Sequence, residues 1–421
     1  MGHAKPRLLV TAEALGRLIS EHFGAATATQ ASLGVAVSGG GDSLALLHLL
    51  KAWGGPLRVV TVDHGLRAEA AGEALGVAEA CAALNVPHDI LRWDGWDGQG
   101  NLSARARAAR YALMRDWALG HGLSGLALGH TAEDQAETVL MRLARRAGVD
   151  GLSGMSAKRG MGKMIMHRPL LAARREALRD YLRGLGVAWV DDPSNTDGAF
   201  RRVQARRALE ALEPLGLTVE ALCDVAGHLA EARETLAQIA AAEADKICRV
   251  AQGDVLIDPV RFSCLRPDIA RRIMEAVLRW ITGADYGPRG AETARALAKV
   301  AAQESFTLAG CRITMSRGEM RVTREYRAAE RAVPSKGGVW DNRWTVSPAP
   351  EGAEWRALGP EGRTMMPDWR QSGVPVASIE ASPALWQGAE ILAAPLGQPD
   401  AGHGAELCRS APDLRTLILS H

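Results

Sequence analysis

Short apolar runs alternate with helical patterns over the first half of the chain, and this alternation most constrains the fold. The apolar runs predict buried strands at residues 33–38, 57–65, 88–93 and 125–130. Helical patterns follow them through residue 50 and then over residues 68–84, 103–121 and 133–146. Strands separated by such helices form right-handed crossovers, so we predict an α/β fold with a parallel twisted sheet and helices on both faces. Ligands of such folds bind at the carboxyl ends of the strands.

The pattern changes after residues 213–216, "EPLG". We expect helices over residues 218–247 and 267–302, and a hairpin over residues 305–325. A junction rich in Pro and Gly, residues 332–338, precedes three short segments that read as strands and turns: "WTVSP" (344–348), "GVPVASI" (373–379) and "LWQGAEILAAP" (385–395). We therefore predict three domains: residues 1–215, a mostly helical domain over residues 216–330, and a small α+β domain over residues 336–421.

A glycine-rich loop lies between the first predicted strand and its helix. Its residues are Ser38, Gly39, Gly40, Gly41, Asp42 and Ser43. Glycines let the backbone approach a ligand closely, and amides at a helix N-terminus bind anions. The loop lacks the lysine of the G-x-x-x-x-G-K-[ST] motif, and it does not match G-x-G-x-x-G. The pattern thus predicts a phosphate site that does not hold a γ-phosphate through lysine.

Composition restricts the setting of this site. The six cysteines are widely spaced, without a C-x-x-C pair, which disfavours a zinc site or a disulfide scaffold. We find no apolar run of the roughly 20 residues that span a bilayer and no signal peptide, so we expect a cytoplasmic protein. The net charge is only +2, but residues 158–207 hold twelve basic and five acidic residues. That local excess favours a phosphate-bearing partner, although solvated helix faces would also explain it.

Several motifs in order resemble one known family. S-G-G-x-D-S after a strand resembles the PP-loop of the N-type ATP pyrophosphatases, which cleave ATP between the α- and β-phosphates. Five further segments resemble the tRNA(Ile)-lysidine synthetase family within that group: "VDHGLR" (62–67), "GHTAEDQAET" (129–138), "RLARRAGVDGLSGM" (142–155), "RPLL" (168–171) and "DDPSN" (191–195). The resemblance covers residues 30–210 closely and the remainder loosely. It implies a Rossmann-like fold of the adenine nucleotide alpha hydrolase type for the first domain.

The resemblance also implies an activity. Such an enzyme uses ATP and Mg²⁺ to adenylate C2 of the cytidine at the first anticodon position of tRNA(Ile) with a CAU anticodon. The amine of free L-lysine then displaces AMP and gives lysidine, with PPi released earlier. The modified tRNA reads AUA instead of AUG and carries Ile instead of Met. The two C-terminal domains would help to select the tRNA.

Site residues follow from the matching positions. By the resemblance Asp42 would hold Mg²⁺ against the phosphates, Asp134 would bind the substrate lysine, and His130 and Glu137 would complete that pocket. His64 is a candidate for the nucleotide pocket, with a core histidine as the alternative. We assign Arg107, Arg110, Arg145, Arg202 and Arg206 to the tRNA or the adenylate. For Asp134 and its neighbours, helix N-terminal acids favoured by the helix dipole are the alternative.

Three departures from the family pattern stand out. Glu133 replaces the usual first aspartate, Arg146 replaces a glycine, and Val203 with Gln204 replaces Asn-Arg. Arg146 puts the geometry of its loop in doubt.

Two rival functions remain. A tRNA 2-thiolase needs a cysteine pair or an iron–sulfur cluster, and Cys81 is the only cysteine of the first domain. A non-catalytic RNA-binding protein is the other. The sequence leaves open the oligomeric state, a homodimer included, and the group that deprotonates the lysine amine.

Overall fold

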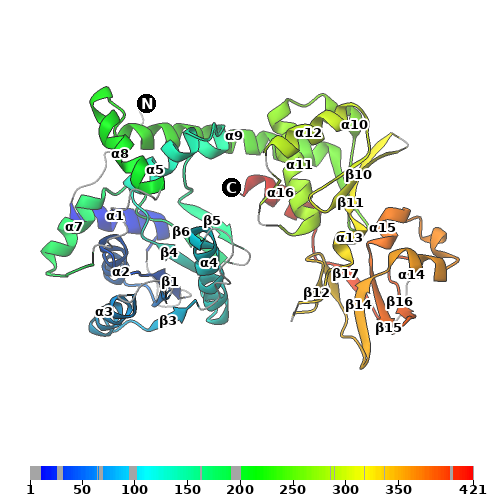
Figure 1. The fold of residues 1–421 in the computed structure, drawn as a ribbon, viewed down its shortest axis with the longest axis horizontal. Coiled ribbons are helices and arrows are strands. Elements are labelled where there is room, and N and C mark those ends of the chain that lie inside the picture. Colours follow the sequence, from blue (N-terminus) through cyan, green and yellow to red (C-terminus); the bar gives the residue numbers. More distant parts are fainter. Residues whose placement is uncertain are drawn as a thin grey trace. The chain divides into compact units, whose positions relative to one another are not determined.

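The computed structural model describes residues 11–25, 32–63, 65, 70–93, 102–161, 164–190, 201–284, 286–288, 290–316, 318–335, 337–398 and 402–420. The chain forms two compact units, Met1–Arg233 and Glu234–His421. Their boundary lies within one helix, α9 (Val219–Ile247), shown in green in Figure 1. No helix among these described ranges is long and apolar enough to cross a membrane. The division into three domains at residues 215 and 335 stays a prediction.

A six-stranded sheet forms the centre of the first unit, in the order β3-β2-β1-β4-β6-β5. Its strands are β1 (Leu33–Ala36), β2 (Leu57–Asp63), β3 (His88–Arg92), β4 (Gly125–Leu128), β5 (Lys158–Met161) and β6 (Met164–His167). All neighbours pair in parallel except β5, which runs antiparallel to β6 at the edge. The predicted parallel sheet is confirmed, with all four predicted strands in place. The β5–β6 hairpin was not predicted, because its basic residues indicated a charged surface rather than strands.

Helices cover both faces of this sheet, as predicted. The helices of the first unit are α1 (Ala12–Phe23), α2 (Gly41–Trp53), α3 (Ala70–Ala83), α4 (Leu102–Gly120), α5 (Ala132–Leu143), α6 (Val149–Leu152), α7 (Arg175–Gly184), α8 (Arg201–Leu212) and the 3-10 turn η2 (Glu213–Leu215). One core joins the sheet to α1, α2, α3 and α7, with Leu15, Leu46 and Leu178 fully buried. A second core on the other face joins the sheet to α4 through Met114 and Trp117.

The strand order places the site. From β1 the chain moves to β2 and β3 on one side, and later to β4 and β6 on the other. Such a reversal leaves a crevice at the carboxyl ends of the two strands beside it. Those ends here are the segments that follow β1 and β4, where the glycine-rich loop and the "GHTAED" segment begin.

The described residues of the second unit form three antiparallel sheets. The largest has the order β7-β8-β11-β10-β9, and two three-stranded sheets have the orders β12-β13-β17 and β14-β15-β16. Their strands are β7 (Cys248–Ala251), β8 (Asp254–Ile257), β9 (Phe306–Leu308), β10 (Cys311–Ser316), β11 (Glu319–Arg324), β12 (Val339–Trp340), β13 (Trp344–Val346), β14 (Ala353–Ala357), β15 (Pro383–Gln387), β16 (Glu390–Ala393) and β17 (Ala405–Leu407). The helices are α10 (Pro259–Ser263), α11 (Pro267–Thr282), α12 (Gly290–Ala301), α13 (Tyr326–Ala329), α14 (Gly359–Met365), η3 (Trp369–Ser372), α15 (Val376–Glu380) and α16 (Ala411–Leu419). The predicted hairpin at 305–325 is present as β10 and β11.

One expectation for this unit was wrong in detail. Residues 373–379 were read as strand and turn, but α15 begins immediately after Pro375, whose carbonyl accepts from the Ser378 and Ile379 amides. The predicted helical region 267–302 is confirmed as two helices, α11 and α12, because Gly283 ends α11 with a left-handed φ of 73°.

The C-terminal helix α16 belongs to the same core as α11. Leu414 and Ile418 of α16 are buried in one cluster with Ile273 and Trp280 of α11. The Trp280 indole N–H donates to the Ser410 carbonyl at 2.9 Å. The end of the chain therefore helps to build the hydrophobic core of the region that begins at residue 234.

Candidate active site

The glycine-rich loop forms the turn that its sequence predicts. Gly39 has a φ of 87°, a left-handed conformation that glycine adopts without strain. Gly40 is the N-cap of α2, and the Ser43 hydroxyl donates to the Gly40 carbonyl at 2.9 Å. The Ser38 amide donates to the Ser43 hydroxyl oxygen at 3.1 Å, so this serine closes the loop on itself. Glycine amides and a helix N-terminus thus gather at one point, as an anion site requires.

The end of β4 lies against this loop. A Cβ at Gly129 would lie 2.8 Å from the carbonyl oxygen of Asp42, so the two segments are in direct backbone contact. Only glycine allows that approach. The contact places the N-terminus of α5 beside the N-terminus of α2, and it brings together two motifs that lie about ninety positions apart in the sequence.

A capping box begins α5. Thr131 is its N-cap, and Asp134 Oδ2 accepts from the Thr131 amide at 3.0 Å and from the Thr131 hydroxyl at 3.1 Å. Helix capping therefore explains one oxygen of Asp134. The other, Oδ1, faces Arg202 Nη1 at 3.7 Å. Burial raises the pKa of Asp134, but the charges of Arg202 and Arg175 outweigh it and hold that pKa below its usual value. The carboxylate stays ionised.

His130 and Glu137 each present a buried atom without a hydrogen-bond partner in the described part of the chain. These atoms are His130 Nδ1 and Glu137 Oε2. Burial lowers the pKa of His130 to about 3, so its imidazole is neutral. Burial raises the pKa of Glu137, and the Asp134 charge acts in the same direction. Unsatisfied buried polar atoms are costly, and at a crevice they indicate groups that wait for a ligand.

Arg175 and Arg206 pair with the carboxylates of the site. Arg175 Nε donates to Asp42 Oδ2 at 3.0 Å, and its Nη2 lies 3.7 Å from Asp134 Oδ2. Arg206 Nε donates to Glu137 Oε1 at 3.1 Å. Burial raises the pKa of Asp42, and the Arg175 charge opposes that rise. Asp42 and Asp134 therefore share Arg175, and Glu137, held by Arg206, lies near enough for the charges of Asp134 and Arg175 to shift its pKa.

Arg175 was missed in the sequence. It lies in the basic stretch 158–207, where its charge does not distinguish it from its neighbours. The signal that could have identified it is its position four residues after "RPLL" (168–171).

Glu133, the first departure, holds α7 in place. Its Oε1 accepts from Arg174 Nε at 2.7 Å, and its Oε2 accepts from the Arg175 amide at 2.9 Å. Arg174 also pairs with Glu220 at the start of α9. The carboxylate at position 133 thus caps the N-terminus of α7 and fixes the backbone from which the Arg175 side chain extends.

The segment "RLARRAGVDGLSGM" forms a loop that docks on α5. The Gln135 amide group donates to the Met155 carbonyl at 3.0 Å and accepts from the Met155 amide at 2.7 Å. Arg142 Nη1 donates to the carbonyls of Gly151 and Gly154, both at 2.8 Å. Much of this motif therefore builds the loop.

Arg146, the second departure, keeps the loop geometry that its replacement of glycine put in doubt. Its φ is 58°, in the left-handed region. Its amide donates to the Leu143 carbonyl at 2.8 Å, and the Ala147 amide donates to the Arg142 carbonyl at 3.1 Å. These are the two bonds of a Schellman motif. The loop closes as it would with glycine, at the expense of backbone strain. Arg145 is exposed beside it.

The other predicted arginines differ in their surroundings. Arg107 is exposed and donates to the Tyr111 hydroxyl at 3.2 Å. Burial lowers the pKa of Arg110, and the nearby charges of Arg107 and Arg202 act in the same direction. These three guanidinium groups are therefore near enough to interact, which suits an anionic partner.

Val203, the third departure, is buried with 7% of its surface exposed.

Two predictions fall outside the described residues. They are His64 and the segment "DDPSN" (191–195). Among the described residues, Asp42 is the candidate ligand for Mg²⁺. The same residues contain no cluster of three His, Cys, Asp or Glu side chains that could hold a metal by themselves. One carboxylate beside a phosphate cradle fits Mg²⁺, which takes its other ligands from phosphates and water.

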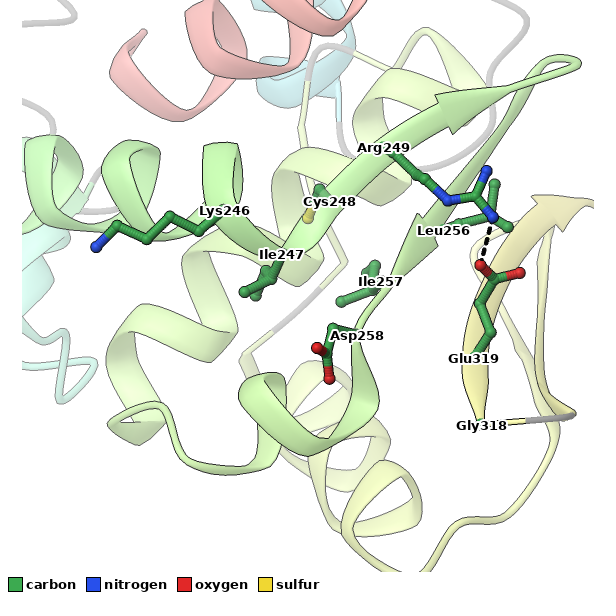
Figure 2. A pocket seen from close by; sticks show the side chains of 9 residues that line it. All are labelled: Lys246, Ile247, Cys248, Arg249, Leu256, Ile257, Asp258, Gly318 and Glu319. Carbon is green, nitrogen blue, oxygen red and sulfur yellow. Dashed lines mark hydrogen bonds and ion pairs between the residues drawn. The ribbon is translucent and has the colours of Figure 1, made fainter.

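A cavity in the second unit differs from this site in how its charged groups are paired. This cavity has a volume of about 280 Å³ and is lined by the end of α9, β7, β8 and the start of β11. Figure 2 shows the side chains that line it. Arg249 Nη2 pairs with Glu319 Oε1 at 2.6 Å, as the dashed line marks, and Lys246 pairs with Glu243 at 2.7 Å. Asp258 caps α10 through the amides of Val260 and Arg261. Its charged groups are already satisfied, unlike His130 and Glu137, so we place the candidate site at the loop.

Comparison with known proteins shows which domain and which family this chain is similar to. A model of the PP-loop domain matches residues 11–212. The tRNA(Ile)-lysidine synthase of Ruegeria pomeroyi is 46% identical over 92% of this chain and 94% of its own length. That of Hyphomonas neptunium is 40% identical over 68% and 79%, and that of Mesorhizobium japonicum is 34% identical over 86% and 84%.

Among solved structures the likeness is weaker. The U34-tRNA thiolase NcsA from Methanococcus maripaludis with its [4Fe-4S] cluster aligns with a TM-score of 0.46 at 15% identity, over 52% of this chain and 78% of that chain. That likeness carries no weight for the thiolase alternative. The loop geometry, the PP-loop match and the near full-length relatives lead to one conclusion: the chain belongs to the tRNA(Ile)-lysidine synthase family.

Proposed function

We propose that this chain ligates L-lysine to C2 of the first-anticodon cytidine of tRNA(Ile) through an adenylated intermediate, and releases PPi and then AMP. Family membership makes it an ATP-dependent ligase. The observation that carries the proposal is the contact between the two helix N-termini. It brings a phosphate cradle at Asp42 and the buried Asp134 onto one arginine, Arg175, with Glu137 near enough for their charges to interact. A nucleotide and an amine nucleophile need such neighbouring sites.

The loop is suited to the first step. Amides of Gly39 to Gly41 and the N-terminus of α2 would hold the β- and γ-phosphates, which leave as PPi. Asp42 would hold Mg²⁺, which when bound neutralises charge on the phosphates. A lysine in the loop is unnecessary, because the loop retains a leaving group and does not transfer the γ-phosphoryl.

The α5 acids are suited to the second step. The ionised Asp134 would bind the lysine ammonium, since its pKa stays below the usual value. Glu137 is the better proton acceptor of the remaining pair. Its pKa is raised, whereas that of His130, at about 3, makes the imidazole a very weak base. We propose that Glu137 Oε2 accepts a proton from the amine as it attacks C2, and that His130 orients the nucleophile or the base.

The arginines are suited to the tRNA. Arg107, Arg110 and Arg202 would contact phosphates of the anticodon loop or the adenylate, and Arg206 would do so while it holds Glu137. Arg145, exposed on the docked loop, would contact the tRNA backbone. Binding should weaken steeply with salt, because each phosphate contact releases counterions. The second unit, Glu234–His421, would contribute tRNA selection.

The test is incorporation of radiolabelled lysine into tRNA(Ile) with a CAU anticodon, in the presence of ATP and Mg²⁺. We expect incorporation by the wild type and a loss of at least a hundredfold in Asp134→Ala, since the ammonium loses its counter-charge. Glu210→Ala is the matched control, because Glu210 is an exposed acid on α8. AMP formation without lysine incorporation would redirect the search to another nucleophile, as in a thiolase. Absence of ATP binding would support a non-catalytic RNA-binding protein.

A further inference from the structure

Arg175 occupies an unusual position for a helical arginine. It is the first residue of α7, and only 20% of its side chain is exposed. Its guanidinium reaches across the site to the PP-loop acid Asp42 at 3.0 Å and to the α5 acid Asp134 at 3.7 Å. One positive group thus lies between the acid assigned to Mg²⁺ and the acid assigned to the substrate ammonium.

The backbone below this side chain is held firmly. The Arg175 amide donates to Glu133, and the adjacent Arg174 pairs with Glu133 and with Glu220. These bonds tie the start of α7 to α5 and to α9. The helix end is therefore fixed, and only the long arginine side chain is left to move between partners.

The four carboxylates of the described site are balanced by arginine partners without any ligand. Each of them contacts at least one arginine: Asp42 with Arg175, Glu133 with Arg174, Glu137 with Arg206, and Asp134 with Arg175 and Arg202. A lysine ammonium that enters this site must displace a guanidinium from Asp134. The displaced charge has no spare carboxylate among the described residues of the network.

ATP changes that balance. With Mg²⁺ bound, its phosphates carry about two negative charges to the loop beside Asp42. Guanidinium groups bind phosphate oxygens in a bidentate manner more strongly than they bind a single carboxylate oxygen. The Arg175 side chain would turn from the carboxylates to the phosphates. Arg202 would then be the one arginine still paired with Asp134 among the described residues, and the carboxylate would be open to the ammonium.

We propose that Arg175 is a positioning residue that couples the two substrate sites: it neutralises Asp134 in the empty enzyme and releases it when MgATP binds. Lysine then binds well only after the nucleotide. This inference rests on the proposed function. It predicts a coupling of about tenfold or more between the two ligands, within the roughly 5- to 150-fold range of typical couplings. Because coupling is reciprocal, lysine should tighten nucleotide binding by the same factor.

The test is equilibrium dialysis of radiolabelled lysine against the full chain at pH 8, with and without Mg²⁺ and α,β-methylene-ATP. In the wild type we expect lysine affinity to rise about tenfold or more with the nucleotide. In Arg175→Met, lysine affinity without nucleotide should rise, because the competing cation is gone. The coupling factor should fall below a third of the wild-type value.

Two further variants complete the experiment. Arg175→Lys keeps the charge and the backbone amide that Glu133 caps, but its shorter side chain cannot span both acids, so the coupling should also fall. If Arg175→Met does not fold, this variant is the test of the coupling. Arg183→Met, on the exposed face of the same helix, should keep the wild-type coupling, since Arg183 pairs with Glu176 and Asp180.

The outcomes separate the two proposals. Equal lysine affinity with and without nucleotide in the wild type overturns the inference, as does unchanged coupling in Arg175→Lys. If the wild type incorporates lysine into tRNA(Ile), either result leaves the proposed function intact. No lysine binding under any condition, together with no incorporation, would remove the proposed function itself.

Discussion

Arg146 offers a prediction whose size follows from the backbone. The residue has a φ of 58° and closes the Schellman motif after α5, where glycine is the usual residue. A side chain in the left-handed region costs about 1–2 kcal/mol relative to glycine. Glycine gains about 0.4–1 kcal/mol of freedom in the unfolded chain, which offsets part of this. The replacement Arg146→Gly should therefore stabilise the first unit by about 0.5–1 kcal/mol.

Thermal unfolding of the full chain measures this effect. For a unit of this size, 1 kcal/mol corresponds to about 2–4 °C in Tm. We expect Arg146→Gly to raise the first unit's transition by about 2 °C. The control is Arg146→Ala, which removes the same charged side chain and keeps the strain, so its Tm should not rise.

A clear result would refute the reasoning. If Arg146→Gly and Arg146→Ala change the Tm equally, the left-handed conformation carries no cost at this position and only the side chain matters. The same variants also test the charge of the loop, because both should weaken tRNA binding equally if that charge meets phosphate.

Two other predictions concern the second unit and the histidine. Removal of residues 336–421 should unfold the second unit, because the core residues Leu414 and Ile418 each contribute about 1.5–3 kcal/mol to its stability. Limited proteolysis of the truncated chain should digest residues 234–335, while nucleotide binding to the first unit persists. A protease-resistant fragment of residues 234–335 would contradict this. The unfolded chain takes up the His130 proton near its ordinary pKa of 6.5, whereas the folded chain does so only near pH 3. The contribution of neutral His130 to the free energy of unfolding is therefore fully present above pH 6.5, and it falls by up to about 1.4 kcal/mol for each pH unit below that value. Urea unfolding at pH 7.5, 6.0 and 5.0 should show a shallower fall in His130→Asn than in the wild type. An identical pH dependence in the two proteins would refute the assignment.

Much of the fold could be predicted because its signals are local. Buried parallel strands such as β1 and β4 are short apolar runs, and glycines mark the turns that follow them. Failures occurred where context overrides local preference. The sequences of β5, with its basic residues, and of the "GVPVASI" segment at α15 fit more than one secondary structure. Packing against neighbouring elements selects the one that forms.

The candidate site was predictable in its residue types and not in its connections. The motifs named Asp42, His130, Asp134 and Glu137, because each motif is a contiguous run of letters. No run of letters shows that Arg175 spans two of these acids, since the three residues come from α2, α5 and α7. Likewise the sequence shows only that Glu133 replaces the aspartate of the family pattern. The structure shows that Glu133 caps α7.

The sequence by itself determined the sheet, the loop without a lysine and the identity of the acids, because strand propensity, glycine freedom and carboxylate chemistry are properties of single residues and their near neighbours. The tertiary structure decided which charges meet. Coulomb interactions depend on distance in space, and the close contact at Gly129 brings residues that lie about ninety positions apart to within a few ångströms. That packing sets the pairing of Arg175 with Asp42 and Asp134, and it leaves buried atoms of His130 and Glu137 without a partner among the residues that the structure describes.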